Sequence, residues 1–203
     1  GWEDSVEASA TPVSLAKFRE IKSMAIDTSG SDDILYLVDQ RVIKKINLTS
    51  GLVYYITGSN TTWQNSFTNG EFDEAYFGNI EDITVSNDGA SLYILDQNAI
   101  RKITDLAGDG SVTTISGQWD WDYRDGTLSQ ARFEGPQGID MDTNGNLWVR
   151  QGVKSLVYIG NVTIIIPKEI IEDNAYRLAP SKYEVLVSFC FKILIIKHFF
   201  HHP

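Results

Sequence analysis

The sequence contains a single cysteine, Cys190, and only five prolines among its 203 residues. One cysteine cannot form an intrachain disulfide, which excludes a small fold held together by disulfide bonds. The low proline count and the lack of any low-complexity stretch exclude collagen-like and linker-like proteins. Hydrophobic residues still make up 42% of the chain, which is enough for a packed core. The sequence therefore predicts a globular protein of one domain or two small ones.

Histidine is nearly absent, and acidic residues outnumber basic ones. All three histidines, His198, His201 and His202, lie in the last six residues. The 17 Lys and Arg residues stand against 27 Asp and Glu residues, so the net charge is −10. Because binding to nucleic acid neutralises phosphates with surplus Lys and Arg, this charge disfavours a nucleic-acid partner. We expect no catalytic residues, no cofactor and no resident metal ion.

No hydrophobic run is long enough for an ordinary membrane span. The most apolar stretch covers residues 185–200 and is interrupted by Lys192 and Lys197. A membrane-spanning helix needs about 20 consecutive, largely uncharged residues. The stretch therefore disfavours a membrane anchor.

Three parts of the chain repeat one pattern. Each carries an Ala-x-Phe triplet, then a turn glycine, then a Leu followed by Tyr or Trp. These positions are Ala16, Phe18, Gly30, Leu35 and Tyr36; Ala75, Phe77, Gly89, Leu92 and Tyr93; and Ala131, Phe133, Gly145, Leu147 and Trp148. A repeat of this period indicates a repeat architecture. We expect the three phenylalanines to be equivalent buried residues where neighbouring units meet.

Each unit contains four short segments rich in β-branched and aromatic residues, separated by Gly, Asn and Asp, as is typical of strands and turns. The predicted strands are 23–27, 34–38, 42–46 and 52–57; 82–86, 91–95, 99–103 and 111–116; and 138–142, 147–150, 156–159 and 162–166. Four-stranded units repeated along a chain are typical of the blades of a β-propeller.

The order of these residues resembles the NHL repeat. The third unit matches best, from Ala131 through Gly145 to Val149, and the second unit supplies the Ile-Arg-Lys-Ile segment 100–103. The resemblance implies an all-β fold, a partial NHL-type β-propeller of about three four-stranded antiparallel blades at residues 1–57, 58–117 and 118–167. The third blade is degenerate, with Gln151 in place of the family's Asp. Residues 168–203 match no blade, and their structure is left open.

The loops between the predicted blades are long, at about 20 residues each, and loops of this length are often functional. They hold aromatic side chains among acidic residues, a composition typical of binding surfaces. The candidate partner-binding residues are Trp63, Trp119, Trp121 and Tyr123. Alternatively, each tryptophan covers the adjacent contact between blades.

Three Asn-x-Thr sequences predict glycosylation at Asn47, Asn60 and Asn161. They favour an extracellular, secreted glycoprotein, with a cytoplasmic location as the alternative. Chance occurrence in a chain rich in Asn and Thr stays open at this point.

The sequence favours a non-catalytic binding or scaffold module of NHL-repeat type, which binds another protein through its inter-blade loops. One alternative is a propeller-type hydrolase or lyase with a site in the central channel, and another is a fragment of a longer NHL-repeat protein without independent function. NHL propellers usually close with six blades, so three blades leave neighbours missing. We therefore also expect self-association through unpaired blade edges.

Overall fold

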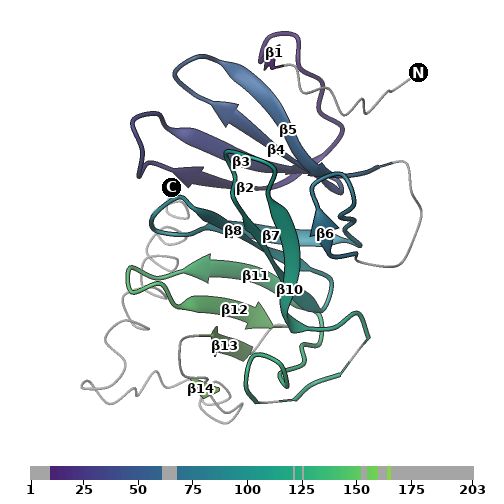
Figure 1. Cartoon of the computed structure of the whole chain (residues 1–203). Helices are drawn as coiled ribbons and strands as arrows, with labels where there is room; N and C mark the ends of the chain where they lie inside the picture. The colour runs from purple at the N-terminus through teal and green to yellow at the C-terminus, as the bar shows by residue number, and fades with distance from the viewer. Residues whose placement is uncertain are drawn as a thin grey trace, which may run out of the picture. The chain divides into compact units, whose positions relative to one another are not determined.

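The structure is a computed structural model that describes residues 10–60, 68–120, 122–124, 126–151, 155–159 and 164–165. These residues belong to one compact unit, residues 1–168. In the described ranges the chain forms strands and turns without any helix (Figure 1). The tail at residues 168–203, whose structure the sequence left open, lies outside the described residues.

The first sheet contains five antiparallel strands in the order β1-β5-β4-β3-β2. Four of them follow one another in the chain as a meander, and the two-residue strand β1 pairs with β5 at the outer edge. Their bounds are β1 Thr11–Pro12, β2 Ile21–Asp27, β3 Ile34–Asp39, β4 Val42–Asn47 and β5 Leu52–Gly58.

The second sheet repeats this topology, in the order β6-β10-β9-β8-β7, and the third sheet has the order β11-β12-β13-β14. In each sheet the first long strand carries a register shift at the same place, as between Ile21 and Ser23 in β2. The bounds are β6 Gly70–Glu71, β7 Ile80–Val85, β8 Ser91–Asp96, β9 Ala99–Thr104, β10 Ser111–Gly117, β11 Pro136–Met141, β12 Leu147–Gln151, β13 Ser155–Ile159 and β14 Ile164–Ile165.

The predicted all-β fold is confirmed, and so is the meander of four strands in each unit. The prediction missed β1 and β6, which make the first two sheets five-stranded. These strands are two residues long and come from the segments that precede each meander, as in the pairing of Thr11 with Val53. A pair of residues carries no period-two pattern, so composition could not reveal them.

The three sheets pack face against face in chain order, as blades of a propeller do, and Figure 1 shows the purple-to-blue first sheet, the teal second and the green third in succession. We call the face that a sheet turns to its predecessor the incoming face, and the face that it turns to its successor the outgoing face. Two apolar clusters fill the contacts. The first joins outgoing Tyr36, Val38 and Ile43 to incoming Ile83, Leu92 and Ile94. The second joins outgoing Leu95 and Ile100 to incoming Ile139, Leu147 and Val149.

The repeated phenylalanines behave as predicted in the second and third units. Phe77 and Phe133 are 2% and 1% exposed and belong to the two clusters between sheets. Phe18 is only half-buried, on the incoming face of the first sheet. Leu37, Ile46 and Val53, which cluster with Phe18 on the same face, are buried. The short strands β1 and β6 pair with the outer strands β5 and β10, whereas β2 and β14 are the end strands of the first and third sheets in the described residues. The expected self-association through unpaired blade edges stays a prediction.

In each of the first two sheets, an aspartate at the end of the second long strand binds the backbone of the segment that precedes the first long strand. Asp39 Oδ1 accepts hydrogen bonds from the amides of Arg19 and Glu20 at 2.8 and 2.9 Å, and Asp39 Oδ2 accepts one from Lys44 Nζ at 2.7 Å. Burial acts to raise the pKa of Asp39, but these three bonds outweigh it, so the pKa lies below its usual value. Asp39 is therefore held as a carboxylate in the folded chain.

In the second sheet, the equivalent residue Asp96 makes the same kind of contacts, and here the charged groups are fully buried. Asp96 accepts a hydrogen bond from the amide of Gly78 and one from Arg101 Nη1 at 3.0 Å, and neither charged side chain is exposed. Arg101 Nη2 also donates to the carbonyl of Thr68 at 2.8 Å. Burial raises the pKa of Asp96 to about 6 in spite of Arg101. Equivalent aspartates thus have opposite pKa shifts because their depths differ.

Candidate functional site

The first long strands of the three sheets, β2, β7 and β11, lie side by side. Together they line an open cavity of about 570 Å³, which we call the inner-strand groove. The groove is formed by residues 24–29, 82–87 and 139–141. It is the described part of the molecule where all three sheets contribute to one surface, so it corresponds to the wall of the predicted central channel.

Asp82 connects all three strands of the groove. Its Oδ1 accepts a hydrogen bond from Ser23 Oγ in β2 at 2.5 Å and one from the amide of Ile83 at 3.0 Å. Its Oδ2 accepts a hydrogen bond from the amide of Ile139 in β11 at 2.9 Å. Asp82 is therefore a structural tie between sheets.

A second polar contact crosses the groove further along the strands. Thr84 Oγ1 donates to Asp140 Oδ1 at 3.3 Å, and the amide of Met141 donates to the same oxygen at 2.7 Å. Burial, together with the nearby Asp82 charge, raises the pKa of Asp140. Three carboxylates line the groove, and its described lining residues include no Lys, Arg, His or Cys. The groove thus presents carboxylate and hydroxyl oxygens from all three strands.

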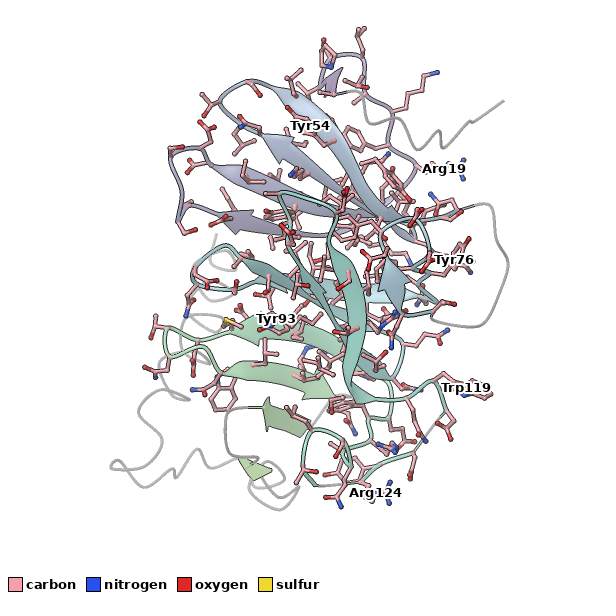
Figure 2. All side chains as sticks on the ribbon, in the orientation of Figure 1. Arg19, Tyr54, Tyr76, Tyr93, Trp119 and Arg124 are labelled. Atoms are coloured by element: carbon pink, nitrogen blue, oxygen red, sulfur yellow. The ribbon has the colours of Figure 1, made fainter. Side chains whose placement is uncertain are left out.

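The loop at residues 118–135, between the second and third sheets, presents two of the predicted partner-binding aromatics. Trp119 is 64% exposed and Tyr123 is 45% exposed. Figure 2 shows Trp119 pointing away from the strands. The prediction that these residues bind a partner stays a prediction, and its alternative, that a tryptophan covers the blade contact, does not describe the exposed Trp119.

The side chain of Asn98 holds this loop at both of its ends. Asn98 is 4% exposed, and its Nδ2 donates to the carbonyls of Trp119 and Asp120 at 3.4 and 3.3 Å. Its Oδ1 accepts a hydrogen bond from the amide of Gly135 at 3.1 Å. A two-way backbone bridge between Arg124 and Arg132 closes the middle of the loop. These hydrogen bonds therefore hold the described backbone next to Trp119 and Tyr123.

The remaining predicted site residues divide into two groups. Trp63, Trp121 and Asn161 lie outside the described residues. Asn47 and Asn60 are described, and both side chains take part in local hydrogen bonds. Asn47 Oδ1 caps the amides of Thr49 and Ser50, and Asn60 Oδ1 accepts from the amide of Arg41 at 3.1 Å. These contacts give both asparagines a structural role, and glycosylation at them stays a prediction.

Sequence reasoning missed the two residues that organise these surfaces, Asn98 and Asp82. Asn98 follows the Asp96-Gln97 pair directly, and that pair recurs as Asp39-Gln40 in the first unit, where Arg41 takes the equivalent place. Asp82 stands where the other units have Ser23 and Gly138. For Asp82, the available sequence signal was that this inner-strand position holds a different residue in each of the three units.

Among the described residues, no group of three His, Cys, Asp or Glu side chains is arranged to hold a metal ion, and no helix suited to crossing a membrane occurs.

No protein-family model matches the sequence, and no curated protein matches it. Solved structures do resemble it. A structural genomics protein of unknown function from Bacteroides thetaiotaomicron VPI-5482 is 31% identical over 59% of this chain and 30% of its own, with a TM-score of 0.51. An auxiliary nutrient binding protein from the same strain is 24% identical over 62% and 33%, with a TM-score of 0.50. Another, from Bacteroides ovatus ATCC 8483, is 14% identical over 71% and 35%, with a TM-score of 0.52.

These likenesses concern the fold and part of the neighbours' length. The chain spans about a third of each solved structure that it resembles. The NHL assignment has no matching family model and stays a prediction. What the comparisons establish is that this chain shares an all-β, propeller-like fold with longer Bacteroides proteins.

Proposed function

We propose that this chain is a non-catalytic binding module of NHL type that recognises another protein through the loop at residues 118–135. The observation that carries the proposal is the exposed Trp119 on a loop whose two ends are fixed by the buried Asn98. Tryptophan is enriched among the few interface residues that supply most of the binding energy. A loop that is already ordered loses less conformational freedom on binding, which favours affinity.

The surroundings of Trp119 indicate the chemistry of the partner. Asp120 and Asp122 are exposed beside it, and the chain as a whole is strongly acidic. An apolar anchor within an acidic rim suits a partner with an apolar pocket and basic residues around it. The binding role described for two solved neighbours agrees with a binding module, although their low identity supports the fold alone. An extracellular location belongs to the proposal, on the ground of the three sequons.

The proposal is tested with a displayed peptide library selected on the whole chain and counter-selected on a Trp119→Ala variant. We expect ligands rich in Lys and Arg around an apolar residue, with at least about tenfold weaker binding to Trp119→Ala, since a central anchor contributes about 2 kcal/mol or more. Leu48→Ala is the matched control, because Leu48 is 47% exposed on a turn of the first sheet. Ligands that bind both variants equally would refute the proposed site.

A further inference from the structure

The second and third units each carry a hairpin just before their first long strand. We call the second-unit hairpin, residues 68–76, the docked hairpin, and its third-unit counterpart, Arg124 with residues 126–132, the strap. One antiparallel backbone bridge closes each hairpin, and the two bridges join Thr68 to Tyr76 and Arg124 to Arg132 (Figure 2 labels Tyr76 and Arg124). The turns also agree, because the amides of Ala75 and Ala131 donate to the carbonyl four residues earlier at 2.9 and 2.8 Å. The two hairpins therefore share one internal structure.

The docked hairpin is bonded to the sheets on both sides of it. Within its own sheet, Arg101 donates to the carbonyls of Thr68 and Tyr76 at 2.8 and 3.3 Å, and β6 pairs with β10. From the first sheet, Thr57 Oγ1 donates to the carbonyl of Phe72 at 2.8 Å. The Phe72 ring packs against the apolar cluster between these two sheets. Contacts from two sheets thus hold this hairpin in place.

The strap has lost these outside contacts. In the part of the chain that the structure describes, every hydrogen bond of the strap joins two of its own residues, as from Arg124 Nε to the carbonyl of Gln130 at 3.2 Å. Leu128 stands where the docked hairpin has Phe72, three residues before the alanine of the repeat, and it is 40% exposed. The same hairpin is therefore docked in one unit and undocked in the next.

One replacement accounts for the missing tie within the third sheet. In the first two sheets a cation bonds the middle residue of the Ala-x-Phe triplet. Lys44 Nζ donates to the carbonyl of Lys17 at 3.0 Å, and Arg101 makes the equivalent bond in the second unit. The strand registers place Val157 at this position of the third sheet, and a valine side chain donates no hydrogen bond.

The tie from the preceding sheet, in contrast, keeps its donor. Ser116 is the counterpart of Thr57, since the two residues pair with the equivalent Ile100 and Ile43 at the ends of β10 and β5. Ser116 is 3% exposed, and its Oγ finds no hydrogen-bond partner among the described residues. A buried hydroxyl without a partner is unfavourable, so a carbonyl that reaches it gains stability.

We propose that the strap has two positions, the open one in the structure and a closed one in which the carbonyl of Leu128 accepts a hydrogen bond from Ser116 Oγ. The closed position copies the bond between Thr57 and Phe72, and it brings Leu128 toward the second apolar cluster. Because the third sheet lacks the cation of the other two, the strap is held less firmly than the docked hairpin and can open.

The two positions differ in what the loop at residues 118–135 presents to a partner. Trp119 and Leu128 are both exposed apolar side chains of this loop in the open position, and closure withdraws Leu128. A partner that contacts both side chains selects the open position, so closure lowers its apparent affinity. The strap is thus an autoinhibitory element of the site proposed above, and this role rests on that proposed function.

Closure is measured with a thiol at position 128. In a Cys190→Ser background, the rate at which Leu128→Cys reacts with a maleimide reports the exposure of the strap. We expect Ser116→Ala to raise this rate at least twofold, because it removes the closing hydrogen bond. Thr113→Ala is the matched control, since Thr113 is an exposed hydroxyl residue of the same strand, and it should leave the rate unchanged. Equal rates with and without Ser116→Ala would overturn the proposal.

A second variant closes the strap from the other side. Gln151→Asp with Val157→Arg gives the third sheet the pair that holds the docked hairpin in the second sheet. We expect this graft to slow the reaction of the Leu128→Cys thiol at least fivefold. A Leu48→Cys thiol on a turn of the first sheet should react at one rate in all forms. A graft that keeps the parent's circular dichroism and reacts at the parent's rate would overturn the proposal, and Ser116→Ala decides it if the graft does not fold.

The autoinhibitory role is tested with selected peptides that lose binding to Trp119→Ala. The graft should bind these peptides at least fivefold more weakly, and Ser116→Ala should bind them about twofold more tightly. Unchanged affinity in a graft whose thiol is protected would overturn the autoinhibitory role. Peptides that bind Trp119→Ala as well as the parent would instead refute the proposed site, while the thiol rates, which need no ligand, still decide whether the strap closes.

Discussion

Two uncharged residues of the third sheet occupy the positions that hold a buried ion pair in the second sheet. Asp96 and Arg101 are fully buried and 3.0 Å apart, and the equivalent third-sheet residues are the uncharged Gln151 and Val157. We predict that Arg101→Val alone lowers the free energy of unfolding by about 3–5 kcal/mol, because it leaves the Asp96 carboxylate buried without its counter-charge.

The double variant Asp96→Gln with Arg101→Val reproduces the third-sheet pair and removes both charges together. We expect Asp96→Gln alone to cost about 3 kcal/mol, since it leaves the guanidinium unneutralised. The double variant should be no less stable than Arg101→Val, so the two changes couple by about 3 kcal/mol. A buried charge, and not the loss of side-chain packing, would then account for most of each single effect.

The four proteins are compared by urea unfolding followed by tryptophan fluorescence and circular dichroism. Asp73→Asn is the control, because Asp73 is exposed and its replacement should change stability by less than about 0.5 kcal/mol. Strictly additive losses in the double variant would refute the reasoning, because they would show that the two side chains stabilise the sheet independently.

Further predictions follow from described contacts. Phe77→Ala should lower the free energy of unfolding by about 3–5 kcal/mol, as the side chain is 2% exposed, and an unchanged urea midpoint would contradict this. The pKa of Asp39 is lowered on folding, so its stabilisation is present above about pH 4 and is lost as the pH falls further; Asp39→Asn should remove that loss. The pKa of Asp96 is raised to about 6, so wild type should lose stability as the pH rises from about 4 to 6, and Asp96→Asn should not. Secretion from a eukaryotic cell should add glycan mass at Asn47, and an unmodified mass would count against a sequon there.

The repeat made the fold predictable because it aligned residues whose burial depends on the same strand register. Phe77, Phe133 and the paired Leu-Tyr positions could be assigned to sheets from spacing alone. Phe18 was predicted to be equally buried but is only half-buried, at the margin of a cluster whose Leu37, Ile46 and Val53 are buried. The repeat identifies a position in a blade, but it does not contain the contacts of that blade's neighbour.

The candidate site was less predictable. Composition singled out Trp119 and Tyr123, and both are exposed. It gave no indication of Asn98, because an asparagine in the hairpin turn between β8 and β9 is an ordinary turn residue by sequence, and its loop contacts exist only in the folded chain. The three-strand tie by Asp82 was equally hidden, since its partners Ser23 and Ile139 lie in different units of the sequence. Hydrogen bonds between different units do not follow the sequence repeat, so the repeat does not reveal them.

The meander topology of the sheets has a consequence for synthesis of the chain. Every long ladder joins strands that are neighbours in sequence, so each sheet can form as soon as its own residues have left the ribosome. The outgoing face of a finished sheet then stays apolar and exposed only until the next sheet emerges. The chain therefore covers its apolar surfaces in order of translation, and a pause between two sheets is the moment at which a nascent chain most needs a chaperone.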